Sequence, residues 1–129
     1  MAAPLRVLVV DDQEIFLRSV EALLETTDEL ELVGRAWNGE LALELVEQLS
    51  PDVVLMDIDM PVMDGVEATR QLAARFPDAQ VFILSGLHEP ERIAAALAAG
   101  AVSYAAKESI GMELIGALTQ FGRRRGSYG

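Results

Sequence analysis

The stretch Val53-Val-Leu-Met-Asp57 decides the fold, because it is a short apolar run that ends in a carboxylate. It lies between Ser50-Pro51-Asp52 and Met60-Pro61, and both flanking segments are typical of turns. A run of this length predicts a strand that is buried on both faces, as in a parallel sheet. Such sheets bind ligands just outside the carboxyl ends of their strands. We therefore expect Asp57 to lie at a functional site rather than in the core.

The rest of the chain alternates between strand and helix patterns. Apolar or alternating runs predict strands at residues 5–10, 30–36, 53–57, 80–84 and 102–106. Helical spacing with capping residues predicts helices at residues 14–26, 39–49, 65–76, 90–99 and 110–121. Asn38, Asp64 and Ser109 are the expected N-terminal caps, and Gly100 suits a C-terminal cap. This alternation predicts a doubly wound α/β domain with a five-stranded parallel sheet and five helices.

Two features of this pattern are more local. The strand at residues 30–36 alternates apolar and polar residues, which indicates a more exposed strand at the sheet edge. Trp37 follows it, and we expect this side chain to pack rather than to bind a ligand.

Composition restricts the classes of function. A chain of 129 residues that is 51% hydrophobic is long enough for one domain with a real core. The absence of cysteine excludes a disulfide framework and thiolate metal sites. A net charge of -11 should repel nucleic acid, so direct nucleic-acid binding by this chain is not expected. No apolar run approaches a membrane span and no signal-peptide pattern is present, so we expect a cytoplasmic protein without membrane contact.

The domain is expected to cover residues 1–121. Residues 122–129 contain three glycines, three consecutive arginines and a serine. This composition predicts a flexible tail or the start of a linker to an effector domain.

Polar residues follow the apolar strands at the points where the strands end. Asp11 and Asp12 follow the first strand, Asp57 ends the third, Ser85 follows the fourth and Lys107 follows the fifth. Parallel strands deliver these residues to one edge of the sheet. Three carboxylates placed together repel one another unless a cation lies among them. Mg²⁺ is the expected cation, because it takes oxygen ligands and commonly uses carboxylates together with phosphate.

An aspartate at such a site can form an acyl phosphate. Asp57 is the candidate nucleophile, with Mg²⁺ on one side and the Lys107 ammonium on the other. Ser85 can donate a hydrogen bond to a phosphoryl oxygen, and Gly86 would let that group approach the backbone.

Five short motifs resemble those of response-regulator receiver domains, the CheY-like family of two-component systems. They are Leu-Val-Val-Asp-Asp at 8–12, Leu-Met-Asp-Ile-Asp-Met-Pro at 55–61, Met-Asp-Gly at 63–65, Leu-Ser-Gly at 84–86 and Ala-Ala-Lys at 105–107. Residues 60–70 are similar to the NarL/FixJ subgroup, whose members usually carry a C-terminal DNA-binding domain. The resemblance implies a flavodoxin-like sheet with the strand order 2-1-3-4-5.

The resemblance also implies roles for the site residues. Asp57 matches the phosphoacceptor that receives its phosphoryl group from a sensor histidine kinase. Asp12 would bind Mg²⁺ directly and Asp11 largely through water, and Asp57 and the backbone carbonyl of Asp59 would complete the protein ligands. Lys107 matches the lysine that pairs with phosphate.

Ser85 and Tyr104 match the two switch positions of the family. The hydroxyl would move toward the phosphoryl group and the aromatic ring would turn inward, which changes the surface of the fourth helix, fifth strand and fifth helix. Glu108 follows Lys107 at a position where many relatives have proline. The implied partners are the kinase, an output domain in the same chain or a separate one, and a second copy in a homodimer. The only reactions the chain would catalyse are its own phosphorylation and dephosphorylation.

Two alternatives remain open at this point. Asp57-Ile-Asp59 resembles the Asp-x-Asp start of haloacid-dehalogenase-type phosphatases, although Pro61 and the position of the motif depart from that pattern. A pseudo-receiver that acts without phosphorylation is the other alternative, although such chains usually lose part of the acidic pocket or the lysine.

Overall fold

The computed structural model describes residues 3–86 and 89–126, and strands and helices alternate along them. The five strands and the five α-helices are β1 (Leu5–Val10), α1 (Glu14–Leu24), β2 (Leu30–Ala36), α2 (Gly39–Leu49), β3 (Val53–Asp57), α3 (Gly65–Arg75), β4 (Gln80–Ser85), α4 (Pro90–Ala99), β5 (Ser103–Ala106) and α5 (Met112–Gly126). A short 3₁₀ turn, η1 (Lys107–Ser109), joins β5 to α5. The predicted element order is therefore confirmed.

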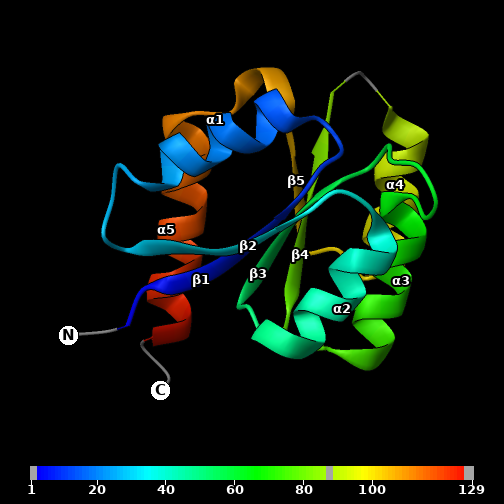
Figure 1. Ribbon diagram of the computed structural model, residues 1–129, viewed down its shortest axis with the longest axis horizontal. Coiled ribbons are helices and arrows are strands. Elements are labelled where there is room, and N and C mark those ends of the chain that lie inside the picture. Colours follow the sequence, from blue (N-terminus) through cyan, green and yellow to red (C-terminus); the bar gives the residue numbers. More distant parts are fainter. Residues whose placement is uncertain (1–2, 87–88, 127–129) are drawn as a thin grey trace.

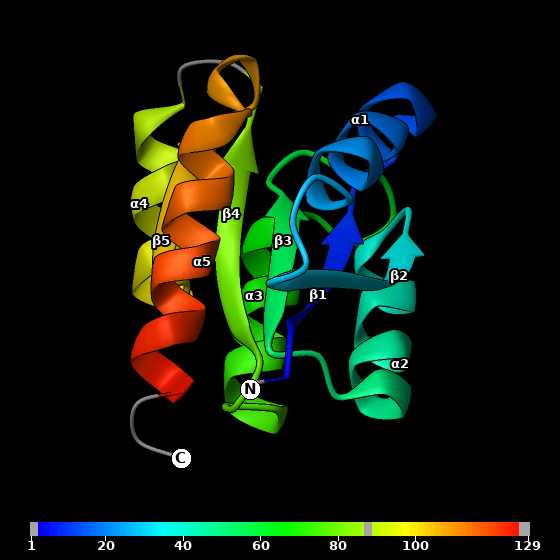
Figure 2. The same ribbon diagram turned by 90° about the vertical axis from the view of Figure 1, so that its left-hand side faces the viewer.

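All strands of the sheet are parallel, in the order β2-β1-β3-β4-β5, as expected. Figure 1 shows α1 and α5 on one face of the sheet and α2, α3 and α4 on the other. Figure 2, turned by 90°, shows α1 and α5 in front of the strands. β2 is an edge strand, as its alternating pattern predicted.

The core has two halves, one on each side of the sheet. Within β3, Val53 and Leu55 pack toward the half that contains α1 and α5, whereas Val54 and Met56 pack toward the half that contains α2, α3 and α4. All four side chains are fully buried. This alternation explains the continuous apolar run, because both faces of a central parallel strand are covered by helices.

Side chains cap the helices that lead into and out of the central strand. The Asn38 side chain accepts a hydrogen bond from the backbone N–H of Leu41, and the Asp64 side chain accepts one from the N–H of Glu67. Each bond satisfies one of the amide groups that a helix N-terminus leaves without a partner. Gly100 ends α4 with a φ of 128°, which favours glycine.

The last helix differs from the prediction at both ends. Ser109 was expected to cap it, but the chain forms a 3₁₀ turn there and α5 begins at Met112. The predicted boundary at residues 121 and 122 lies inside α5, which continues to Gly126. Arg123 pairs with Glu29 at 2.9 Å and the backbone at Gly122 lies beside Leu5, so tertiary contacts extend the helix. Residues 127–129 of the predicted tail lie outside the described residues.

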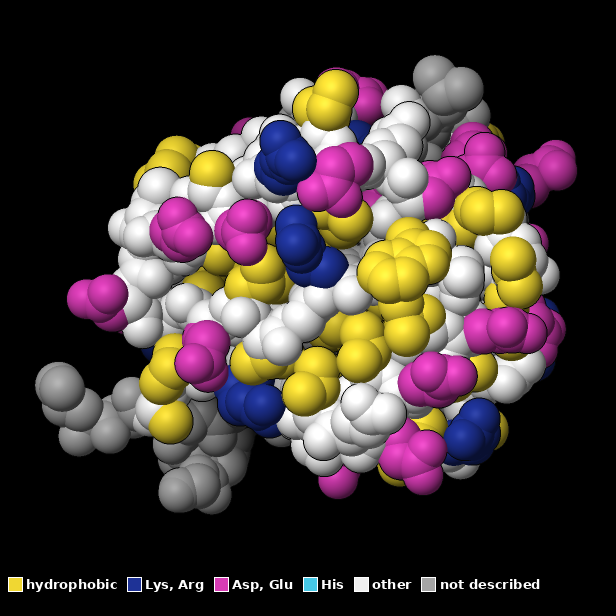
Figure 3. Space-filling view, viewed as in Figure 1, with side chains coloured by type: hydrophobic (Ala, Val, Ile, Leu, Met, Phe, Trp, Pro, Cys, Tyr) yellow, Lys and Arg dark blue, Asp and Glu magenta, His cyan; other side chains and the backbone are white. Residues whose placement is uncertain are grey.

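Two observations concern the surface. The expected packing role of Trp37 is wrong, because its side chain is 59% exposed at the end of the edge strand. Figure 3 shows acidic side chains spread over one face of the molecule, with fewer basic ones among them. Among the described residues, no helix is long and apolar enough to cross a membrane.

Candidate functional site

Three carboxylates meet at the carboxyl ends of β1 and β3, as the strand-end pattern predicted. Asp11, Asp12 and Asp57 each offer one oxygen, and these oxygens lie within 4.8 Å of one another. Asp11 and Asp57 are buried, whereas Asp12 is exposed. We call these three residues, together with Lys107, the strand-end pocket.

Backbone contacts fix the position of Asp57. The N–H of Asp59 donates to Oδ1 of Asp57 at 3.2 Å, and the N–H of Gly65 donates to the carbonyl of Ile58 at 3.2 Å. A Cβ atom at Gly65 would lie 2.3 Å from the carbonyl oxygen of Asp57. Only glycine lets the start of α3 approach the end of β3 this closely. The Met-Asp-Gly motif therefore serves to place Asp57.

Asp11 is held on both its backbone and its side chain. Its N–H donates to the carbonyl of Ala36 at 2.9 Å, and its Oδ1 accepts from the N–H of Gln13 at 2.8 Å. Its buried Oδ2 forms an ion pair with Nζ of Lys107 at 2.5 Å. Both oxygens of Asp11 are therefore held in place, Oδ1 by a backbone amide and Oδ2 by the lysine.

Lys107 is the cation of the pocket. Its Nζ lies 2.5 Å from Asp11 Oδ2 and 3.3 Å from Asp57 Oδ2, and 4.6 Å from the centre of the Phe16 ring. It also donates to Oε1 of Gln13 at 3.3 Å. Burial alone would lower the pKa of the Lys107 ammonium, but hydrogen bonds and charge from Asp11 and Asp57 outweigh burial and raise it. The ammonium therefore stays charged in the pocket.

The pKa of the Asp57 carboxyl is raised from 3.8 to about 6. Burial is the larger cause, and the negative charge of Asp11 is the second. Lys107 and the Asp59 N–H counteract both causes but do not cancel them. The pocket therefore holds excess negative charge even with its lysine in place.

The residues present fit a divalent cation. Three carboxylates converge, two of them are buried, and the pKa of Asp57 is raised. Hard oxygen ligands of this kind suit Mg²⁺, which binds through a few carboxylates and keeps several waters. Asp59 lies next to the pocket, but its side chain is 79% exposed and points to a different partner.

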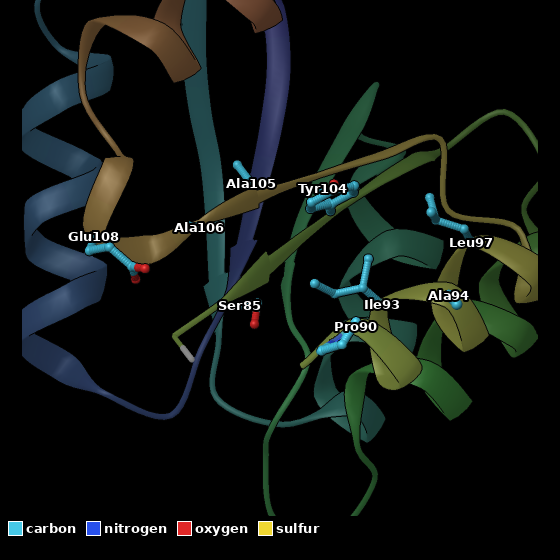
Figure 4. Close-up of a pocket in the computed structure, with 9 residues that line it drawn as sticks. All are labelled: Ser85, Pro90, Ile93, Ala94, Leu97, Tyr104, Ala105, Ala106 and Glu108. Carbon is cyan, nitrogen blue, oxygen red and sulfur yellow. The ribbon is translucent and has the colours of Figure 1, made fainter. Parts of the chain in front are cut away.

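The predicted switch residues line a cavity of about 320 Å³ between α4 and β5. Ser85 is 3% exposed at the end of β4, whereas Tyr104 is 54% exposed. Figure 4 shows both side chains around this cavity, with Ile93 and Leu97 of α4 on its other side. Gly86 is exposed, and a Cβ atom there would lie 3.7 Å from Cδ of Lys107. The Lys107–Glu108 peptide bond is trans.

Sequence reasoning missed four residues at or beside the site. Gln13 and Phe16 contact the Lys107 ammonium. Glu89, at the start of α4, contacts Ser85. Arg92 of α4 contacts the loop after β3. Phe16 lies within the predicted helix at residues 14–26, where an apolar side chain at helical spacing indicates only a core position. Charged residues at the start of a helix resemble an ordinary solvated face, so nothing in the pattern distinguished Glu89 or Arg92.

Comparison with known proteins agrees with this geometry. The family model for the response regulator receiver domain matches residues 7–119. The transcriptional regulatory protein DegU of Brevibacillus brevis is 43% identical over 105 residues, which are 81% of this chain and 44% of that protein. The chain spans about half the length of the curated relatives it matches, with shares of 44%, 52% and 54%.

Solved structures are similar over nearly the whole chain. The signal receiver domain of the response regulator NarL from Mycobacterium tuberculosis is 31% identical, with a TM-score of 0.88. The match covers 95% of this chain and 98% of that one. A CheY-like receiver domain protein from Methanospirillum hungatei JF-1 is 25% identical with a TM-score of 0.87, covering 98% and 99%. The fold, the strand-end pocket and these matches show that the chain belongs to the response regulator receiver domain family, in its NarL/FixJ subgroup.

Proposed function

We propose that Asp57 accepts a phosphoryl group from the phosphohistidine of a sensor histidine kinase in a Mg²⁺-dependent reaction. The observation that carries this proposal is the convergence of Asp11, Asp12 and Asp57, with the Lys107 ammonium paired to Asp11 and Asp57. Membership in the receiver family leaves the phosphatase alternative without support. The complete acidic pocket and lysine favour a phosphorylated receiver over a pseudo-receiver.

The chain's own residues supply the nucleophile and its orientation. One oxygen of Asp57 forms a bond to phosphorus while the P–N bond of the donor breaks, and the electron pair stays on the imidazole nitrogen. The Asp59 N–H holds Oδ1, and Lys107 lies within 3.3 Å of Oδ2, where its charge can neutralise a phosphoryl oxygen. Asp11, Asp12, Asp57 and the backbone carbonyl of Asp59 would hold Mg²⁺. When bound, this ion supplies the positive charge that phosphoryl transfer requires.

Phosphorylation would then act on Ser85 and Tyr104. The Ser85 hydroxyl would move to the phosphoryl group, with the backbone N–H of Gly86 beside it. The Tyr104 ring would turn from its exposed position into the cavity that it lines with Ser85. This movement would change the surface formed by α4, β5 and α5, and a two-state surface can carry a signal.

The output of this signal is proposed from the relatives. DegU and LiaR are transcriptional regulatory proteins by name, and each is longer than the part that this chain matches. We extend that function to this chain as control of transcription through a DNA-binding domain outside it. A homodimer is a further proposal, and sedimentation with and without a phosphoryl mimic tests it, since a monomer in both states would contradict it.

Intact-mass spectrometry after incubation with acetyl phosphate and Mg²⁺ tests the phosphoacceptor. The expected result is one added phosphoryl group that requires Mg²⁺ and is absent in Asp57→Ala. Asp59→Asn is the matched control and should still be labelled, because its side chain is exposed and its backbone carbonyl is kept. An adduct that persists in Asp57→Ala would contradict the proposal. With no adduct on the wild type, beryllofluoride binding decides between rapid hydrolysis and a pseudo-receiver.

A further inference from the structure

Arg92 joins α4 to the loop that follows β3. Its Nη1 donates to Oε1 of Glu89 at 3.1 Å, and its Nη2 donates to the carbonyl of Ile58 at 2.6 Å. Ile58 directly follows Asp57, so this guanidinium contacts the backbone beside the phosphoacceptor. The Arg92 side chain is 34% exposed, and the contact spans 34 positions of sequence.

Two further carboxylates lie around the same guanidinium. Oδ1 of Asp59 is 3.5 Å from Nη1, and Oδ2 of Asp64 is 3.6 Å from Nη2. We call Asp59, Asp64, Glu89 and Arg92 the surface cluster. An arginine fork can serve several acceptors at once because its donors point in fixed directions. The cluster therefore ties the start of α4 to both ends of the loop at residues 58–64.

Glu89 contacts Ser85 with its second oxygen. The Ser85 hydroxyl donates to Oε2 of Glu89 at 3.4 Å, while Oε1 of the same carboxylate accepts from Arg92. Glu89 stands at the N-terminal boundary of α4, and its side chain forms no capping hydrogen bond there. Its carboxylate is therefore engaged with Ser85 and Arg92 rather than with the helix end.

A serine hydroxyl has a single proton to donate. It can donate that proton to Glu89 or to a phosphoryl oxygen on Asp57, but not to both. We propose that Glu89, held by Arg92, is the acceptor that retains the Ser85 hydroxyl in the unphosphorylated state. This inference rests on the proposed function, because it assumes that Ser85 moves to the phosphoryl group. Glu89 and Arg92 are positioning residues, since neither touches the reacting atoms.

Removal of the competing acceptor should make the phosphorylated arrangement easier to reach. Glu89→Ala is expected to bind beryllofluoride, a mimic of the phosphoryl group, about 3- to 10-fold more tightly than the wild type, the range for loss of one hydrogen bond. Arg92→Ala should change the affinity in the same direction but less, because Glu89 would remain without its partner. Arg92→Lys keeps the charge and should restore part of the wild-type affinity.

Titration calorimetry with beryllofluoride and saturating Mg²⁺ measures these affinities. Glu91→Ala is the matched control, because it removes one exposed carboxylate from the first turn of the same helix. Its affinity should equal that of the wild type. The decisive comparison repeats Glu89→Ala in the Ser85→Ala background, where no hydroxyl is left to retain. The gain in affinity should disappear there, as expected of a coupled pair.

The outcomes separate the two proposals. A wild type that binds no beryllofluoride contradicts the proposed function itself. A wild type that binds, with Glu89→Ala unchanged or weaker, overturns only the role of Glu89. The same holds if the gain persists in the Ser85→Ala background, because Glu89 would then act through some other group.

Discussion

The strand-end pocket and the surface cluster each combine three carboxylates with one cation, yet they differ in burial. Asp11 and Asp57, beside Lys107, are buried. Beside Arg92, Asp64 is 45% exposed and Asp59 is 79% exposed. Water screens charges at the surface and does not reach buried ones to the same extent. Burial is the larger cause of the raised pKa of Asp57, and the charge of the neighbouring Asp11 adds to it.

The largest expected difference between the strand-end pocket and the surface cluster is the loss of stability when the cation of each is removed. Lys107→Ala leaves two buried carboxylates without a counter-charge, and should lower the free energy of unfolding by about 3–5 kcal/mol at pH 7.5 in chelator. Arg92→Ala acts at a partly exposed cluster and should cost about 1 kcal/mol. Urea unfolding of both variants measures this. Equal losses of stability in the two variants would contradict the expected difference between the pocket and the cluster.

The protonation of Asp57 offers a second test. The folded state binds this proton more tightly than the unfolded chain, since the pKa rises from 3.8 to about 6. The stability that this group contributes is therefore complete below about pH 4 and is lost as the pH rises through about 6. In Mg²⁺-free buffer at pH 7.5, Asp57→Asn should be more stable than the wild type by about 3 kcal/mol.

Unfolding of both proteins across pH 4 to 8 measures that difference, and the difference should shrink toward pH 4. Asp59→Asn is the matched variant in the surface cluster, and at pH 7.5 its stability should lie within about 0.5 kcal/mol of the wild type. A pH-independent difference between wild type and Asp57→Asn would show that the burial of its charge is not the cause.

Mg²⁺ should also distinguish the carboxylates of the strand-end pocket from those elsewhere on the molecule. At ten times its dissociation constant, an ion that binds only the folded state stabilises it by about 1.4 kcal/mol. Thermal unfolding should show this gain for the wild type and a much smaller gain for Asp12→Asn. The remote and exposed Asp28→Asn should keep the full gain. Retention of the gain by Asp12→Asn would place the ion outside the strand-end pocket.

The smallest predicted effect is that of a substitution in the loop at residues 58–64. Val62 has a φ of 69° and an exposed side chain, and a β-branched residue rarely adopts this conformation. Val62→Gly relieves that strain and should stabilise the fold by about 1 kcal/mol, since the relief exceeds the added entropy of the unfolded chain. Chemical unfolding measures it, with exposed Val102→Gly as the control. That control lacks a positive φ and should be destabilised.

The strand-end pocket could be predicted from the sequence because its members follow apolar strands, and parallel strands end at one edge. The caps Asn38 and Asp64 were also predictable, since capping is a local interaction. The contacts of Arg92 were not, because they join α4 to a loop 34 positions away and depend on the packing of α4. The continuation of α5 past residue 121 was not predictable either, because its contacts there are distant in sequence, as between Arg123 and Glu29, 94 positions apart.

The phosphoryl group is expected in the strand-end pocket, on Asp57, rather than on the surface cluster. Borohydride reduction of the labelled protein converts an acyl phosphate of aspartate to homoserine, which peptide mass spectrometry can locate. Homoserine is expected at position 57 alone, with position 59 of the same peptide unchanged. Homoserine at position 59 or 64 would contradict it.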